Sequence, residues 1–255
     1  MGDALKLFSK AVIVPYKSLL FPLILGPVLG FWLMAILWML VPPHQLGVDA
    51  KWSVLLLLVL IRVGVYPLIL RGWGSNCKYS IIGAIRGIAQ TISYEIRLSL
   101  LLFSFLAWYW TTSLKTLAIM TSDIAVSGLI LCWLPLWVLS CVAETNRTPF
   151  DFREGESELV SGFNTEYGGA GFALIFMAEY GIILLFRYFT RVILLGLSPL
   201  KGGGGFLVLF LAFFWVWLRR TFPRYRYDKL ISLCWKAVLP FTLLMLCYRS
   251  WLTLL

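Results

Sequence analysis

Residues 21–41 read FPLILGPVLGFWLMAILWMLV, and none of these 21 side chains is charged. A helix needs about 20 predominantly apolar residues to cross the roughly 30 Å hydrocarbon core of a bilayer. This stretch therefore predicts a transmembrane helix, which ends before Pro42 and Pro43. Its apolar residues are continuous rather than alternating, which favours a helix over a strand of a membrane barrel.

The composition of the whole chain agrees with this stretch. Of its 255 residues, 60% are hydrophobic and 13% are charged, whereas soluble domains contain about 45–50% apolar and about 25% charged residues. A soluble fold of this size would leave large apolar patches exposed to water. The composition excludes a disordered chain, a disulfide-rich secreted scaffold and a soluble enzyme. It predicts an all-α integral membrane protein.

We expect a single membrane domain, residues 1–255, with about seven transmembrane helices. After residues 21–41, the predicted spans are Ser53–Leu70, Thr91–Trp110, Ile124–Ala143, Ala170–Phe186, Gly205–Leu218 and Ala237–Leu255. When alternate loops are assigned to one side, 14 Lys and Arg residues, Arg71 among them, fall on the side of the N-terminus and six on the other. Such an excess marks the cytoplasmic or matrix side, so we place the N-terminus there.

The first 20 residues have a different pattern. Lys6, Lys10 and Lys17 alternate with apolar side chains, and there is no apolar core with a cleavage site of the signal-peptide kind. The pattern predicts an amphipathic helix at the membrane interface for residues 1–20.

Charge and cysteine content argue against two other kinds of site. The net charge is +10, but the Lys and Arg residues lie in loops, where they set orientation, so we expect no nucleic-acid partner. The five cysteines form no CxxC pair and His44 is the only histidine. We therefore expect no metal site in this chain alone.

The acidic residues are concentrated in one loop, residues 144–169, on the inner side. Six of the 12 acids of the chain lie there: Glu144, Asp151, Glu154, Glu156, Glu158 and Glu166. One interpretation is a solvated turn. The aromatic residues and the proline between the carboxylates favour a second interpretation, a folded loop whose acids face a shared cavity.

Two further acids, Glu95 and Glu179, lie within predicted spans. A carboxylate in a membrane helix costs about 2.5–3.5 kcal/mol on insertion scales. Each is either a neutral acid that is hydrogen-bonded to a neighbouring helix or a member of a proton relay. Glu144 directly follows another predicted span, Ile124–Ala143, so we favour the relay. We also expect the polar stretch of residues 90–94 to line a wet cavity.

A basic segment, residues 219–228, follows the sixth predicted span and contains Arg219, Arg220, Arg224 and Arg226 between aromatic residues. It is either an anchor that contacts anionic lipid headgroups or the rim of a pocket. As a rim, it would receive a planar, partly polar ligand or an acidic partner.

Several motifs together resemble one known family. Residues 143–151 read AETNRTPFD, and residues 154–164 continue as EGESELVSGFN, followed by Glu166 and Tyr167. Further matching stretches are GWGSN at 72–76, AQTISYE at 89–95, FMAEY at 176–180 and FPRYRYD at 222–228. The chain closely resembles the chain 1 family of NADH–ubiquinone oxidoreductase, respiratory complex I.

This resemblance implies a fold, a function and a set of residues. It implies the subunit at the heel of the membrane arm, which forms part of a quinone tunnel and couples quinone reduction to proton translocation. The implied relay is Glu95, Glu144 and Glu179. The implied acidic end of the quinone chamber is Asp151, Glu154, Glu156, Glu158, Glu166 and Tyr167. The implied chamber and subunit junction also include Arg147, Arg219, Arg224, Arg226 and Asp228.

The resemblance also implies ubiquinone as a substrate at a site shared with two hydrophilic subunits, small membrane-arm subunits as neighbours, and lipids. The chain carries no redox centre, so electrons would arrive from a partner and the chain alone would not catalyse the reaction. The implied location is the mitochondrial inner membrane, with a bacterial plasma membrane as the alternative. The alternative functions are the heel subunit of an ion-pumping membrane hydrogenase and a proton-coupled secondary transporter.

The sequence departs from the family pattern in three respects. Relatives have a further membrane helix before the position of Gly2, so we expect that a separate chain supplies this helix or that the tunnel entrance is remodelled. Arg62 and Arg97 occur where relatives usually carry small or apolar residues. Phe152 and Arg153 place a positive charge among the acids of the loop.

Overall fold

The computed structural model describes residues 2–10, 14–41, 51–120, 128–153, 155, 162–195 and 204–254. Every regular element in these ranges is a helix, which confirms the predicted all-α membrane bundle. The elements are α1 (Gly2–Ser9), α2 (Leu20–Met39), α3 (Ser53–Val63), α4 (Val65–Gly74), α5 (Lys78–Tyr109), α6 (Leu114–Met120), α7 (Gly128–Glu144), η1 (Gly162–Asn164), α9 (Gly169–Leu195), α10 (Gly204–Thr221), α11 (Tyr227–Leu233), η2 (Cys234–Val238) and α12 (Leu239–Leu254).

Four segments of the described chain are long and apolar enough to cross a membrane. They are Leu20–Met39, Ser53–Gly74, Gly169–Arg191 and Tyr227–Tyr248, and they overlap the first, second, fifth and seventh predicted spans. The other three predicted spans fall on α5, α7 and α10. The number seven and the orientation of the bundle stay predictions. So does the interfacial role of residues 1–20, in which α1 covers Gly2–Ser9.

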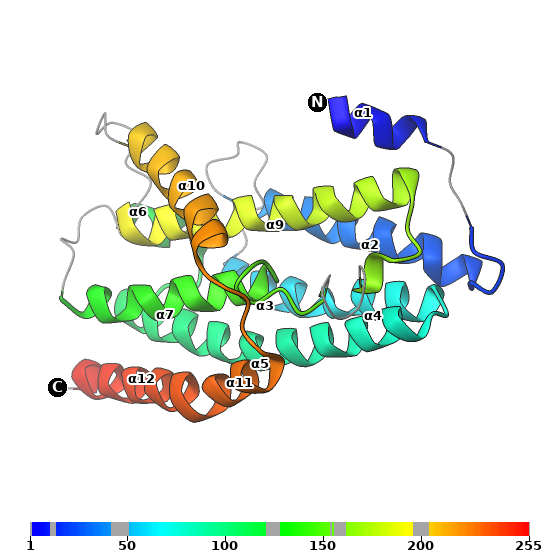
Figure 1. The fold of residues 1–255 in the computed structure, drawn as a ribbon. Coiled ribbons are helices and arrows are strands. Elements are labelled where there is room, and N and C mark those ends of the chain that lie inside the picture. Colours follow the sequence, from blue (N-terminus) through cyan, green and yellow to red (C-terminus); the bar gives the residue numbers. More distant parts are fainter. Residues whose placement is uncertain are drawn as a thin grey trace.

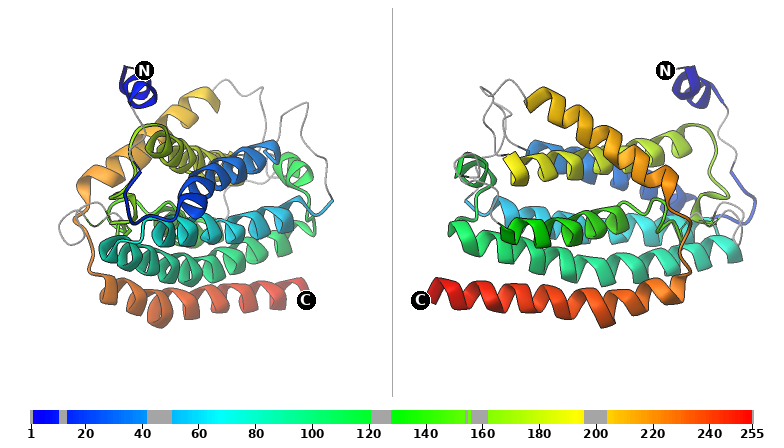
Figure 2. Two further views of the ribbon diagram at one scale, coloured as in Figure 1. Left: turned by 90° about the vertical axis from the view of Figure 1, so that its right-hand side faces the viewer. Right: turned by 60° about the vertical axis from the view of Figure 1, so that its left-hand side comes forward.

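The bundle is layered around α5, a helix of 32 residues. Helices α4 and α7 pack against α5 on one side and α12 packs against it on another. Helix α2 packs against both α4 and α9, so that α2 and α9 form a further layer (Figure 1). Both views in Figure 2 show α12 as an outer layer and α10 inclined to the other helices.

The second span is divided into α3 and α4 at Gly64. Pro67 lies three residues further on, and its ring and missing N–H disturb the hydrogen bonds of the preceding turn. The N–H of Gly64 is instead shared between the carbonyls of Leu60 and Ile61, at 3.3 and 2.9 Å. The last span contains a π-helical turn, η2, which ends two residues before Pro240. This wider turn is a different local change of hydrogen bonding next to a proline.

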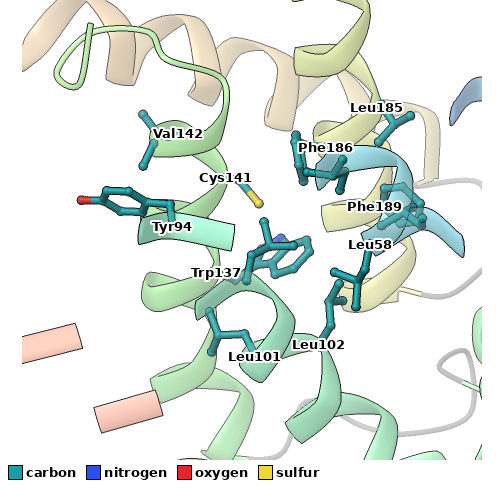
Figure 3. Packing of buried hydrophobic residues seen from close by; sticks show 14 of the residues in the cluster. Leu58, Tyr94, Leu101, Leu102, Trp137, Cys141, Val142, Leu185, Phe186 and Phe189 are labelled. Atoms are coloured by element: carbon teal, nitrogen blue, oxygen red, sulfur yellow. The ribbon is translucent and has the colours of Figure 1, made fainter. Parts of the chain in front are cut away.

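An aromatic cluster fills the centre of the bundle between α5, α7 and α9. Trp137 lies in the middle of it and is edge-on to Phe186 (Figure 3). The ring of Trp137 is also stacked on that of Trp133, with ring centroids 5.1 Å apart. The indole N–H of Trp137 donates to the hydroxyl of Thr190 at 3.1 Å. Since lipid is as apolar as these side chains, close packing and such hydrogen bonds hold the helices together.

Candidate functional site

An internal cavity of about 80 Å³ lies between α2, α3, α4, α5 and α9 and the residues that end α7. Leucines of α2 and α3 line its apolar side. Three carboxylates line its polar side: Glu95 from α5, Glu144 from the end of α7, and Glu179 from the middle of α9. The structure therefore brings together the three acids that the sequence predicts as a relay.

Several polar atoms at this cavity are buried and have no hydrogen-bond partner in the described part of the chain. They are Oε1 of Glu95, Oε2 of Glu144, Nε of Arg71 and Oδ1 of Asn146. A buried polar group without a partner costs about 1–3 kcal/mol. Four such atoms around one cavity are therefore a costly arrangement, and the cavity is large enough and polar enough to hold water.

Glu179 differs from the other two acids because it is held in an ion pair. Nη2 of Arg147 lies 2.9 Å from Oε2 of Glu179, and both side chains are less than 10% exposed. The guanidinium also lies over the ring of Tyr180, 5.1 Å from its centroid. Helix α7 ends at Glu144, and Asn146 takes a left-handed conformation (φ 50°), which turns the chain so that Arg147 reaches α9.

The acidic loop is fastened to α5 by Gln90. This side chain is fully buried, and its amide donates to the carbonyl oxygens of Ala143 and Phe150, each at 2.9 Å. One residue of α5 thus fixes both the end of α7 and the start of the loop.

The basic segment 219–228 packs on the acidic loop. Nη2 of Arg224 lies 3.2 Å from Oδ2 of Asp151, and the N–H of Tyr225 donates to the carbonyl of Pro149 at 3.0 Å. The rings of Tyr225 and Phe150 are 5.8 Å apart. The structure therefore joins the two motifs that the sequence separates by about 70 residues.

Tyr167 connects the end of the acidic loop to α2. Its hydroxyl donates to the carbonyl of Leu23 at 3.2 Å. Burial raises the pKa of Tyr167 to about 12, and the opposing effect of the Arg71 cation is smaller. The phenol therefore stays protonated at neutral pH and remains a hydrogen-bond donor.

Comparison with known proteins identifies the family. The family described as NADH dehydrogenase matches residues 1–250. NADH-ubiquinone oxidoreductase chain 1 of Heterololigo bleekeri is 41% identical over 254 residues, which cover 97% of this chain and 80% of that protein. The protein of the same name from Artemia franciscana is 44% identical over 251 residues, covering 97% and 81%. The chain belongs to the NADH dehydrogenase family. The predicted membership is thus confirmed.

Some of the other family-motif residues do not line the cavity, and some lie outside the described residues. Arg226 and Asp228 pair with each other at 3.2 Å on the surface, where each side chain is more than 70% exposed. Glu166 is half-buried in the loop after η1. Glu154, Glu156 and Glu158, like the side chain of Arg219, lie outside the described residues. The roles that the family resemblance implies for all these residues stay predictions.

The polar stretch on α5 was expected to line the cavity, and this expectation is largely wrong. Within the stretch, Thr91 lines the cavity, whereas Gln90 holds the loop and Tyr94 lies under the guanidinium of Arg97. The reason is helical geometry, because successive residues on a helix point about 100° apart. Arg97 points away from Glu95 for the same reason, as expected.

Two cationic residues that line the cavity were not predicted to do so from the sequence. Arg71 was counted as a loop residue, but it is buried on α4 and lines the cavity. Arg153 lines it as well, from within the acidic loop. Both guanidinium groups lie over the ring of Phe163, at 5.8 and 5.6 Å from its centroid. In the family motif, Phe163 belongs to the SGFN segment, which was the available signal for this contact.

Proposed function

We propose that this chain is a membrane-arm subunit of a proton-pumping NADH:ubiquinone oxidoreductase, and that Glu95, Glu144 and Glu179 form its proton relay. The observation that supports the proposal best is that these three acids, from three helices, line one buried cavity. Isolated buried acids could each be explained as structural. A cluster of acids with oxygens that have no partner in the described ranges of the chain is better explained by groups that exchange protons with water.

The relay would work through water in the cavity. Carboxylates that share a cavity titrate as a coupled set, so the arrival of a proton at one acid changes the readiness of the next to release its own. Glu144 stands at the end of α7, where the acidic loop begins, and is therefore the entrance of the relay. Glu179 differs from the other two members because it is held in an ion pair with Arg147.

We infer further that the acidic loop and the basic segment form this chain's part of the quinone chamber. The contacts of Arg224 with Asp151 and of Tyr225 with Pro149 and Phe150 support this, because they make one folded unit of the two motifs. The relatives are named for ubiquinone, and ubiquinone would be the substrate at a site shared with hydrophilic subunits. The residues assigned to this unit are Arg147, Asp151, Glu154, Glu156, Glu158, Glu166, Tyr167, Arg219, Arg224, Arg226 and Asp228.

In this arrangement the chain itself transfers no electrons. It would hold the quinone head near the relay, while a hydrophilic partner supplies the electrons and small membrane-arm subunits receive the protons. The proposed location is the mitochondrial inner membrane, where the four apolar segments would be embedded.

The test is the variant Glu144→Gln in the assembled complex. The amide keeps the size of the side chain and removes its ability to carry a proton. We expect quinone reduction and proton uptake to fall together by at least tenfold, while native gels show normal assembly. NADH oxidation by an artificial acceptor that bypasses the quinone should stay unchanged. Wild-type rates of both quinone reduction and proton uptake would show that Glu144 is a structural acid.

A further inference from the structure

Arg71 is a buried cation to which the proposed relay has so far assigned no task. Its side chain is 5% exposed, it lines the acid cavity from α4, and its Nε has no hydrogen-bond partner in the described part of the chain. A guanidinium held in this way needs a reason, because burying a charge away from water is costly.

Two glycines of α2 make room for this side chain. A Cβ atom at Gly26 would stand 2.8 Å from Cγ of Arg71, and a Cβ atom at Gly30 would overlap its Nη2. Gly26 and Gly30 are four residues apart and thus lie on one face of the helix. Because both positions have no side chain, the aliphatic stem of Arg71 fits against this face of α2. The guanidinium group then lies at the cavity.

The charges around the cavity come from several of the elements packed against it. Three acids line it: Glu95 on α5, Glu144 on α7 and Glu179 on α9. Arg147 pairs with Glu179, Arg153 lies in the loop, and Arg62 on α3 is a cation that acts on Glu95. Tyr167 is a neutral phenol. Among the lining residues that the structure describes, Arg71 is the only charged one from α2 or α4.

We infer that Arg71 is a positioning residue of the proposed relay: seated on Gly26 and Gly30, it supplies a fixed positive charge at the cavity that the three acids line. The inference rests on the proposed relay function. A nearby cation favours the ionised form of a carboxylate. The guanidinium cannot itself give up its proton, so it biases the acids without taking part in the transfer.

The experiment compares the pH profiles of quinone reduction coupled to proton uptake in assembled complexes. Arg71→Met removes the countercharge, so the midpoint of the rise in activity should move to higher pH by about one unit. Gly30→Ala keeps the charge and displaces the guanidinium, because the added methyl group meets the flexible end of Arg71 rather than backbone. It should shift the midpoint in the same direction by a smaller amount, and the double variant should match Arg71→Met alone.

Arg97→Met is the matched control. Arg97 is also fully buried and its guanidinium nitrogens have no hydrogen-bond partner in the described residues, but it lies 3.6 Å from the ring centroid of Tyr94 and outside the cavity. Its loss should leave the midpoint unchanged. If Arg71→Met does not assemble, Gly30→Ala and Arg71→Lys still separate displacement from charge, since the lysine should hold the wild-type midpoint within a few tenths of a unit.

The outcomes separate this inference from the relay itself. A wild-type midpoint in both Arg71→Met and Gly30→Ala, together with lost activity in Glu144→Gln, overturns the countercharge and leaves the relay standing. Unchanged profiles in all three variants overturn both.

Discussion

The aromatic cluster around Trp137 and the acidic cavity at Glu144 share helix α7, where the two residues are about 10 Å apart along the axis. In the cluster, the polar atoms of the tryptophans are paired: Trp137 donates to Thr190, and Trp133 donates to the carbonyl of Leu101. In the cavity, atoms of Glu95, Glu144 and Arg71 have no hydrogen-bond partner among the residues that the structure describes.

The difference shows what each region is built for. In the aromatic cluster, the two stacked tryptophans Trp133 and Trp137 each donate the indole N–H to an acceptor, at 3.1–3.2 Å. Two turns further along, the same helix places Glu144 at a cavity of about 80 Å³, where one oxygen of its carboxyl group has no hydrogen-bond partner among the described residues. A native structure keeps unpaired buried polar atoms only where they are compensated or used. The comparison therefore predicts that changes in the cluster affect stability and that changes in the cavity affect activity.

The largest expected effect on stability is at Trp137. Replacing it with alanine removes the stacked ring and leaves a void, which costs about 3–5 kcal/mol in protein cores. We expect Trp137→Ala to abolish assembly on native gels. Trp137→Phe keeps a ring in place and loses the bond to Thr190, worth about 1 kcal/mol, so this complex should assemble with a lowered Tm. Full assembly of the alanine variant would contradict the assignment of the cluster to stability.

The next largest effect on stability is expected at the ion pair between Arg147 and Glu179. Glu179 lies on α9, the helix that also contributes Phe186 to the aromatic cluster. Arg147→Met leaves the carboxylate of Glu179 without its cation, and breaking one side of a buried pair costs about 3–5 kcal/mol at most. We therefore expect a lowered thermal stability, measured as Tm of the purified complex.

The double variant Arg147→Met with Glu179→Gln is the control for this pair. Because neither charge remains, its Tm should lie closer to wild type than that of Arg147→Met alone. Activity should not recover with it, since Glu179 belongs to the proposed relay. Recovery of both would mean that the pair only stabilises the fold.

The two regions also differ in how far the sequence predicts them. Membrane helices follow from apolar runs, because crossing a bilayer demands length and hydrophobicity in one continuous segment. Glu95 and Glu179 stand out in such runs because a charge there is costly. The division of the second span at Gly64 was less visible, although Pro67 is its cause.

Arg71 shows where prediction from sequence stops. At the end of an apolar run, an arginine is typical of a loop facing the aqueous side. Its burial depends on contacts with Gly26 and Gly30, more than 40 residues away on another helix. Hydropathy describes each segment singly and contains no information about which helix lies opposite. The cavity's acids were therefore predictable, and its countercharge was not.

The smallest expected effects are at the basic segment, which lies outside both regions and contains its own comparison. Arg226 and Asp228 form a pair at 3.2 Å in which both side chains are more than 70% exposed, whereas the Asp151 partner of Arg224 is only 10% exposed. Exposed pairs contribute at most about 1 kcal/mol because water screens them. We expect Arg226→Gln to leave the Tm of the complex within about 1 °C of wild type and Arg224→Gln to lower it by several degrees. High salt should reduce the Tm effect of Arg226→Gln but not that of Arg224→Gln, since screening acts mainly on exposed charges. Equal effects of the two variants would mean that a partner subunit covers Arg226 in the complex, and would thereby place the subunit junction on this surface rather than on the loop contact of Arg224.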